Sequence, residues 1–285
     1  MIRVNMDHVV SIIHEVSDEY ILPRFQNLTS GEISFKIGDD PVTIADKEAE
    51  IALSERLSEL LPGSKVLGEE AFATNQCISE HLFSESPVWI IDPIDGTRNF
   101  VKGSSDFGVI VALAEQNQTI AGWIYNPTSK EVLYSEKGSG TYFKGKKRRV
   151  LPAQELSKMH GFLGIQMIDY YEKFNLSNMI EPSFQTMSAG AHEYPRLVLN
   201  EAHFGKNVPQ SHFRASFAYS YPWDDAAGVL IHKESGGYSA FWDGRAYCPS
   251  IMNEGLALAP DEDSWHHLKE WCMTFAQLPE SIHHE

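Results

Sequence analysis

The segment most suggestive of chemistry is Trp89–Phe100, which reads WIIDPIDGTRNF. Its first residues are apolar β-formers and predict a strand buried on both faces. Asp92 ends this apolar run and Asp95 follows three residues later, with Pro93 fixing the backbone between them. We therefore expect both carboxylates at one end of the strand, where Gly96 lets backbone N–H groups approach a ligand closely. Because a helix is expected to follow, a phosphate group can bind here.

Further acidic residues stand where other predicted elements begin or end. Glu69 and Glu70 follow directly on the short apolar segment Lys65–Gly68, and Asp224 lies at the start of a predicted helix beginning at Trp223. Each has a purely structural alternative. Glu69 and Glu70 fit a solvated strand edge, Asp224 fits a helix N-cap, and the DPIDGT turn fits an Asx turn.

Taken together, these acids predict a metal site. The four carboxylates that can converge are those of Glu69, Asp92, Asp95 and Asp224. At one site they would carry about −4, repel one another and be driven toward protonation. Two Mg²⁺ ions remove that conflict, because Mg²⁺ binds through a few carboxylates, waters and substrate phosphate oxygens. Since paired ions can activate a water and stabilise a leaving oxygen, the prediction is metal-assisted hydrolysis of a phosphate ester.

Three motifs in this order resemble the inositol monophosphatase family of Mg²⁺-dependent, Li⁺-sensitive phosphatases: GEE at 68–70, DPIDGT at 92–97 and WDDAAG at 223–228. Pro41–Asp46 resembles the segment ahead of the family's first long helix, and the resemblance spans about residues 35–245. It implies a layered α/β fold, a five-layer α/β/α/β/α sandwich of the sugar-phosphatase type. It also implies a small phosphate monoester as substrate, two or three Mg²⁺ ions, a homodimer, and water as the nucleophile.

The resemblance also implies roles for individual residues. The metal ligands would be Glu69, Asp92, the Ile94 carbonyl, Asp95 and Asp224. Thr97 would orient the attacking water with support from Asp46, while Glu70 would lie behind the ligands or near a third ion. The substrate would contact Ile94, Asp95, Gly96, Thr97, Gly190, Ala191, His192 and Asp224. Within that set, the N–H groups of Gly96 and Thr97 would hold the phosphate.

The substrate itself stays open. Inositol-processing members of the family place a Glu seven residues before the WD aspartate, whereas this chain has Phe217 there. A polyol hydroxyl needs a polar partner, so histidinol phosphate, a sugar phosphate or a 3′-phosphonucleotide are alternatives. His192 or Glu193 would supply a different polar contact, unless their segment is a surface loop.

The surrounding elements follow from periodicity. Residues 4–26 and 41–61 predict amphipathic helices, the second one stopped by Pro62 and Gly63. Strands are predicted at 65–68, 88–91, 107–114 and 121–125, with a hairpin formed by 131–135 and 140–143.

A boundary is expected near the basic turn at 144–149. It divides an N-terminal α+β domain, 1–150, from a C-terminal α/β domain, 151–285. The second half has an apolar segment at 161–166 and a mixed segment at 190–202 that is expected to be helical after Pro195. Its helix from Trp223 is expected to end at Gly236–Gly237, so the active site would lie between the two halves.

Composition sets limits on function. The chain has 285 residues, 42% of them hydrophobic, and only three cysteines, which fits a reducing compartment and a cytoplasmic location. Its net charge of −16 disfavours nucleic acid and anionic lipid, and it lacks the apolar run of about 18–20 residues that a membrane helix needs. Two other classes remain open: a non-catalytic interaction protein using the basic residues at 144–149, and a Ca²⁺- or Mg²⁺-stabilised structural site without turnover.

Overall fold

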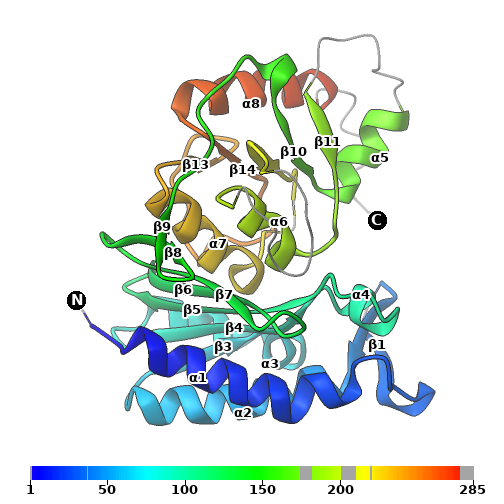
Figure 1. Ribbon diagram of the computed structural model, residues 1–285, viewed down its shortest axis with the longest axis vertical. Helices are drawn as coiled ribbons and strands as arrows, with labels where there is room; N and C mark the ends of the chain where they lie inside the picture. The colour runs from blue at the N-terminus through cyan, green and yellow to red at the C-terminus, as the bar shows by residue number, and fades with distance from the viewer. Residues whose placement is uncertain (1, 37, 174–181, 200–209, 219, 277–285) are drawn as a thin grey trace.

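Five layers of helix and sheet stack along the long axis of the molecule in the computed structural model (Figure 1). The structure describes residues 2–36, 38–173, 182–199, 210–218 and 220–276. From the N-terminal side the layers are two helices, a large sheet, two central helices, a second sheet and an outer helical layer. The predicted α/β/α/β/α sandwich is therefore confirmed.

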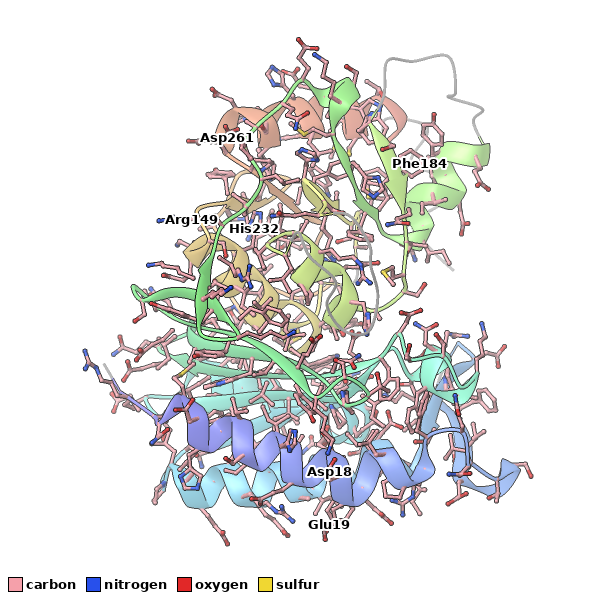
Figure 2. The ribbon with its side chains drawn as sticks, in the orientation of Figure 1. Asp18, Glu19, Arg149, Phe184, His232 and Asp261 are labelled. Atoms are coloured by element: carbon pink, nitrogen blue, oxygen red, sulfur yellow. The ribbon has the colours of Figure 1, made fainter. Side chains whose placement is uncertain are left out.

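The first layer consists of α1 (Met6–Val16) and α2 (Ile44–Leu60). The predicted first helix is real, but after Val16 it continues as a π turn over Ser17–Ile21 and a 3₁₀ turn over Leu22–Arg24. Its outer face is solvated, as exposed Asp18 and Glu19 show (Figure 2).

The large sheet has the strand order β3-β4-β5-β6-β7-β8-β9. These strands span Lys65–Gly68, Val88–Asp95, Gly108–Glu115, Gln118–Asn126, Glu131–Glu136, Gly140–Phe143 and Lys146–Arg148. Only β3 and β4 are parallel; the other neighbours are antiparallel. The expected hairpin is present, and half of the basic turn, Lys146–Arg148, forms the edge strand β9. A separate ribbon pairs β1 (Ile33–Lys36) with β2 (Asp40–Thr43).

Short helices follow two strands of the large sheet at the same edge. They are α3 (Glu69–Thr74), directly after β3, and α4 (Thr97–Val101), one residue after β4. Between them, a 3₁₀ segment covers Gln76–Phe83.

The second sheet has the order β11-β10-β12-β14-β13. These strands span Ser183–Gln185, His160–Leu163, Phe213–Ala215, Leu256–Ala259 and Tyr238–Phe241. Outside it lie α5 (Ile165–Lys173) and α8 (Glu262–Ala276) (Figure 1). The apolar segment predicted at 161–166 is thus divided, because the chain leaves β10 at Gly164 and turns into α5.

The central layer holds α6 (Gly190–Arg196) and α7 (Pro222–Glu234). The expectation that helix would follow Pro195 was wrong: α6 precedes and includes it, because the Ala189 carbonyl accepts the N–H groups of His192 and Glu193 and starts the helix there. Residues 200–202 of that prediction lie outside the described residues.

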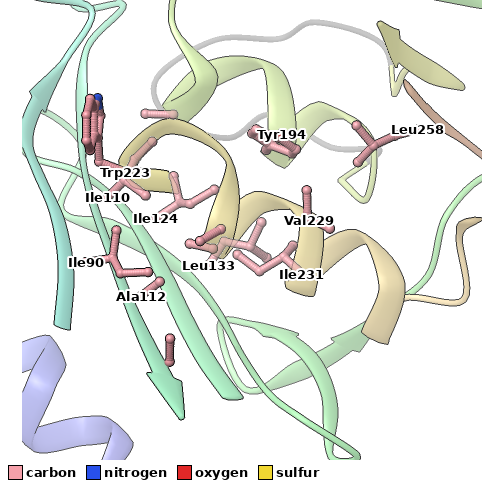
Figure 3. Packing of buried hydrophobic residues seen from close by; sticks show 14 of the residues in the cluster. Ile90, Ile110, Ala112, Ile124, Leu133, Tyr194, Trp223, Val229, Ile231 and Leu258 are labelled. Carbon is pink, nitrogen blue, oxygen red and sulfur yellow. The ribbon is translucent and has the colours of Figure 1, made fainter. Parts of the chain in front are cut away.

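Helix α7 packs across the large sheet through an apolar cluster (Figure 3). Ile90, Ile110 and Ile124 of the sheet meet Val229 and Ile231 of the helix there. A Cβ at Gly228 would collide with the Tyr194 ring of α6, so a glycine is required for the two central helices to approach this closely.

The predicted capping role of Asp224 was also wrong. The N-cap of α7 is Tyr221, and Pro222 takes the first helical position, where its missing N–H costs nothing. Asp224 is the third residue of the helix, which frees its carboxylate from the cap position.

The predicted boundary near residue 150 falls between the two large sheets, since β9 ends at Arg148 and β10 begins at His160. The division into domains 1–150 and 151–285 stays a prediction. Among the described residues, no helix is both long enough and apolar enough to cross a membrane.

Candidate metal and phosphate site

Three carboxylates from distant parts of the chain converge at the end of β4. Ligand oxygens of Asp92, Asp95 and Asp224 all lie within 4.8 Å of one another. The first two stand on either side of an irregularity in the pairing of β4 with β5, at Pro93 and Ile94, which turns both toward the same side. The strand therefore runs through both acids and ends at Asp95, later than predicted.

The Asx-turn alternative is correct as local structure, because the Asp92 carboxylate accepts the Ile94 N–H at 3.0 Å. Gly96 then adopts a φ of +85°, which a residue with a side chain rarely adopts, and leads directly into α4. The turn thus aims the carboxylates and also serves as ordinary backbone structure.

A cavity of about 470 Å³ opens beside these carboxylates. Its lining includes Glu69, Ile94, Gly96 and Thr97 besides the three aspartates. Helix α3 brings Glu69 there from the end of β3, and the parallel pairing of β3 with β4 places both strand ends at one edge. The two acidic motifs, at 68–70 and 92–97, therefore share one cavity.

Thr97, which lines the cavity, is hydrogen-bonded to the buried Asp46. The Thr97 hydroxyl lies 3.1 Å from Asp46 Oδ1 and 2.9 Å from the Ile94 carbonyl oxygen. Asp46 is fixed by its place in the capping box of α2, where its other oxygen accepts both the N–H and the hydroxyl of Thr43. A residue that stabilises a helix start thus also orients the threonine hydroxyl.

Glu69 and Glu70 share a lysine. Lys36 Nζ lies 2.7 Å from an oxygen of each, reaching over from β1. Behind them, Glu50 of α2 accepts the backbone N–H groups of Glu70 and Ala71. Glu70 is thus tied to Lys36, beside the cavity but outside the aspartate cluster.

Burial and mutual repulsion dominate the electrostatics. Burial, reinforced by neighbouring carboxylates, raises the pKa of Asp92 and of Asp224 well above the usual range. Burial also raises the pKa of Asp95 to about 7 and that of Asp46 to about 6. The raised pKa values mean that this environment disfavours the charged form of the carboxyl groups. A bound cation would favour the charged form again.

The Glu69–Glu70 pair is different because it has a cation within the protein. Burial raises the pKa of Glu70 to about 7, with the Glu69 charge acting in the same direction. Burial alone would lower the pKa of Lys36, but the charges of both glutamates outweigh it and raise that pKa above its usual range.

A buried ionic network supports the cluster from behind. Arg214 of β12 lies 3.0 Å from Glu193 and 3.1 Å from Asp225, and its guanidinium covers the Tyr194 ring. The Tyr194 hydroxyl donates to Asp225 at 2.6 Å. This network links α6 and α7, so it fixes the helix start that carries Asp224.

The predicted substrate loop divides into two parts. The Ala191 N–H donates to Asp95, and a Cβ at Gly190 would lie 3.4 Å from the backbone oxygen of Asp224, so this part of the loop lies beside the cluster. His192 instead is fully buried, with its ring 3.0 Å from the Asn126 amide nitrogen. It does not line the cavity, and Glu193 is engaged with Arg214.

Phe217 does not line the cavity either; its ring packs near Trp242, which directly follows β13. Lys36, Glu50 and Arg214 are the site residues that sequence reasoning missed. Only the unusual burial of charged residues marks them, and that is not visible in a single sequence.

The sequence profile of the inositol monophosphatase family matches residues 5–279. A fructose-1,6-bisphosphatase/inositol-1-monophosphatase of Thermotoga maritima is 31% identical over 210 residues, which cover 72% of this chain and 73% of that protein. An inositol-1-monophosphatase of Mesorhizobium japonicum is 31% identical over 239 residues, 83% of each chain.

Solved structures share the fold. The Thermotoga maritima IMPase superposes with a TM-score of 0.76 at 22% identity, covering 95% of this chain and 98% of that one. An IMPase/NADP phosphatase complexed with Mg²⁺ and phosphate has a TM-score of 0.72 at 20% identity, covering 95% and 94%.

Proposed function

The chain belongs to the inositol monophosphatase family, and from that premise we propose that it hydrolyses a small phosphate monoester with the help of Mg²⁺. The two relatives described above are named as phosphatases. The single observation that carries the proposal for this chain is the convergence of Asp92, Asp95 and Asp224 beside a cavity.

The donor set fits a hard divalent cation. Oxygen ligands from carboxylates are what Mg²⁺ prefers, and the raised pKa values indicate a site that lacks positive charge. We assign metal binding to Glu69, Asp92, the Ile94 carbonyl, Asp95 and Asp224. When bound, two or three Mg²⁺ ions would neutralise these carboxylates and lower the pKa of a bound water.

The remaining residues position the reactants. Thr97 would orient the attacking water, because its hydroxyl is fixed between Asp46 and the Ile94 carbonyl. Gly96 and Thr97 would hold the phosphate through their backbone N–H groups. The water oxygen bonds to phosphorus and the water gives up one proton, the ester P–O bond breaks, and the leaving oxygen takes up one proton. The products are an alcohol and inorganic phosphate.

Phosphate release from a panel of monoesters, with Mg²⁺ and with EDTA, tests the proposal. Asp95→Asn should abolish Mg²⁺-dependent release, whereas Asp263→Asn, an exposed acid in the first turn of α8, should not. If no ester is hydrolysed by the wild-type protein at any Mg²⁺ concentration, the enzymatic proposal fails and a non-catalytic role gains ground. Li⁺ sensitivity, a homodimer and a cytoplasmic location stay predictions.

A further inference from the structure

The cavity beside the acidic cluster has an aromatic wall. Phe72 and Tyr221 flank Trp223, each with its ring centroid 4.9 Å from that of the indole. Tyr221 is stacked on Trp223 with 9° between the ring planes, whereas Phe72 is tilted by 51°. All three line the cavity, and Phe72 and Tyr221 are only half-buried.

The wall is built from the two segments that also carry proposed metal ligands. Phe72 follows Glu69 by one turn in α3, and Trp223 directly precedes Asp224 in α7. The rings cannot move far without moving those carboxylates. An ester whose phosphate lies at the carboxylates therefore has these rings as neighbours of its alcohol part.

A second apolar surface lines the same cavity. Ile165, the first residue of α5, is 58% exposed even though it lines the cavity. Apolar side chains around a few convergent polar groups are typical of ligand sites. The exposed isoleucine thus offers a second contact for a flat apolar group.

Most of the charged side chains in the described lining already have a partner or belong to the proposed metal site. Asp40 lies 3.5 Å from Arg98, Glu69 is held by Lys36, and the other lining carboxylates form the cluster itself, while Ser188 adds a hydroxyl to the lining. Hydroxyls of a substrate that find no partner are penalised on binding. Phe72 and Ile165 offer a polyol no such partner, whereas they suit the face of a planar ring.

We propose, on the basis of the phosphatase function proposed above, that the substrate is a phosphate monoester whose alcohol carries a planar aromatic ring. Phe72 and Tyr221 would contact the ring face, with Ile165 as the second apolar contact. Hydrolysis then yields inorganic phosphate and the ring-bearing alcohol. A nucleobase and an imidazole share this chemistry.

The test compares kcat/KM in Mg²⁺ for two aromatic esters, 3′-AMP and histidinol phosphate, with that for two non-aromatic esters, inositol 1-phosphate and glycerol 2-phosphate. The better of the aromatic esters should exceed both non-aromatic ones by at least about tenfold, as expected for stacking on an aromatic side chain. The two aromatic esters separate a nucleobase from an imidazole as the preferred ring.

Variants assign the preference to the wall. Tyr221→Leu and Phe72→Leu should each lower the ratio of kcat/KM for aromatic esters to kcat/KM for non-aromatic esters by about 5- to 30-fold, chiefly through KM. Tyr221→Phe should retain it. Phe83→Leu, a change at a side chain that is 72% exposed and outside the cavity lining, is the matched control and should leave the ratio unchanged.

Melting curves identify any variant that fails to fold. If one of the two Leu variants does not fold, the ratio measured for the other one tests the inference. If esters are hydrolysed but a non-aromatic one is turned over as well as or better than the aromatic ones, this inference is wrong while the phosphatase proposal stands. The same holds if folded Leu variants keep the wild-type ratio. If no ester is hydrolysed, the phosphatase proposal itself has failed.

Discussion

Asp95→Asn should make the protein more stable when no divalent cation is present, although it removes activity. Burial raises the pKa of Asp95 to about 7 in the folded protein, against the opposing hydrogen bond from the Ala191 N–H. In the unfolded chain the same carboxyl group titrates near ~3.9. At neutral pH and above, folding therefore forces an ionised carboxylate into a place that disfavours its charge.

The sign and size follow from this difference in pKa. Because Asp95 binds its proton more tightly in the folded state, its contribution to the free energy of unfolding is most favourable at low pH. That contribution falls as pH rises from about 4 to about 7. A difference of about 3 pKa units corresponds to about 4 kcal/mol. Asparagine carries no charge, and its amide oxygen can still accept the Ala191 N–H. At about 2 °C per kcal/mol, the melting temperature should rise by up to about 8 °C.

Thermal unfolding followed by circular dichroism checks this. In EDTA near pH 8 the variant should melt above the wild type, and near pH 4.5 the two should converge. Mg²⁺ should raise the wild-type melting temperature by more than that of the variant, because only the wild type has the full set of carboxylates. Asp263→Asn should behave as wild type throughout.

The reasoning is refuted if Asp95→Asn melts below the wild type in EDTA near pH 8. It is equally refuted if the gap between the two proteins is as large near pH 4.5 as near pH 8, since the effect would then not come from ionisation.

Three further changes test other parts of the site. Thr97→Val should lower kcat by about 100-fold with little change in KM, because the hydroxyl is proposed to orient water rather than bind substrate; steady-state kinetics decide. Arg214→Met should lower stability by about 3–5 kcal/mol in urea unfolding, since two buried carboxylates lose their cation. Gly228→Ala should cost about 1–3 kcal/mol by overpacking against Tyr194, whereas Gly31→Ala, which meets no atom within 4 Å, should be near neutral; calorimetry separates them.

Local patterns were enough to predict the elements that carry the site. The buried strand before Asp92 and the helix containing Asp224 were predicted by apolar runs and by breakers such as Gly236, and both are present. The residue that caps the helix containing Asp224 was mispredicted from the sequence. Pro222 occupies the first helical position, so the cap moved to Tyr221 and Asp224 was free to join the cluster.

Contacts between distant segments were beyond the sequence. Lys36, at the end of β1, contacts Glu69 and Glu70 at the start of α3. Arg214 of β12 contacts Glu193 of α6 and Asp225 of α7. Nothing adjacent to either residue in the chain marks it as buried. His192 shows the converse, because its place in a motif suggested substrate contact, whereas packing directs its ring toward Asn126.

Apolar packing between α7 and the large sheet holds the carboxylates of the acidic cluster together, although their mutual repulsion opposes this arrangement. A fully buried aliphatic or aromatic side chain contributes roughly 1.5–3 kcal/mol. Two or three of the apolar residues between α7 and the large sheet, such as Ile124 and Ile231, therefore offset the cost of ionising one carboxylate. Because that cluster contains many such residues, α7 should stay docked, with Asp224 facing Asp92, before any cation binds. Mg²⁺ should then raise the melting temperature while leaving the circular dichroism spectrum of the folded protein unchanged.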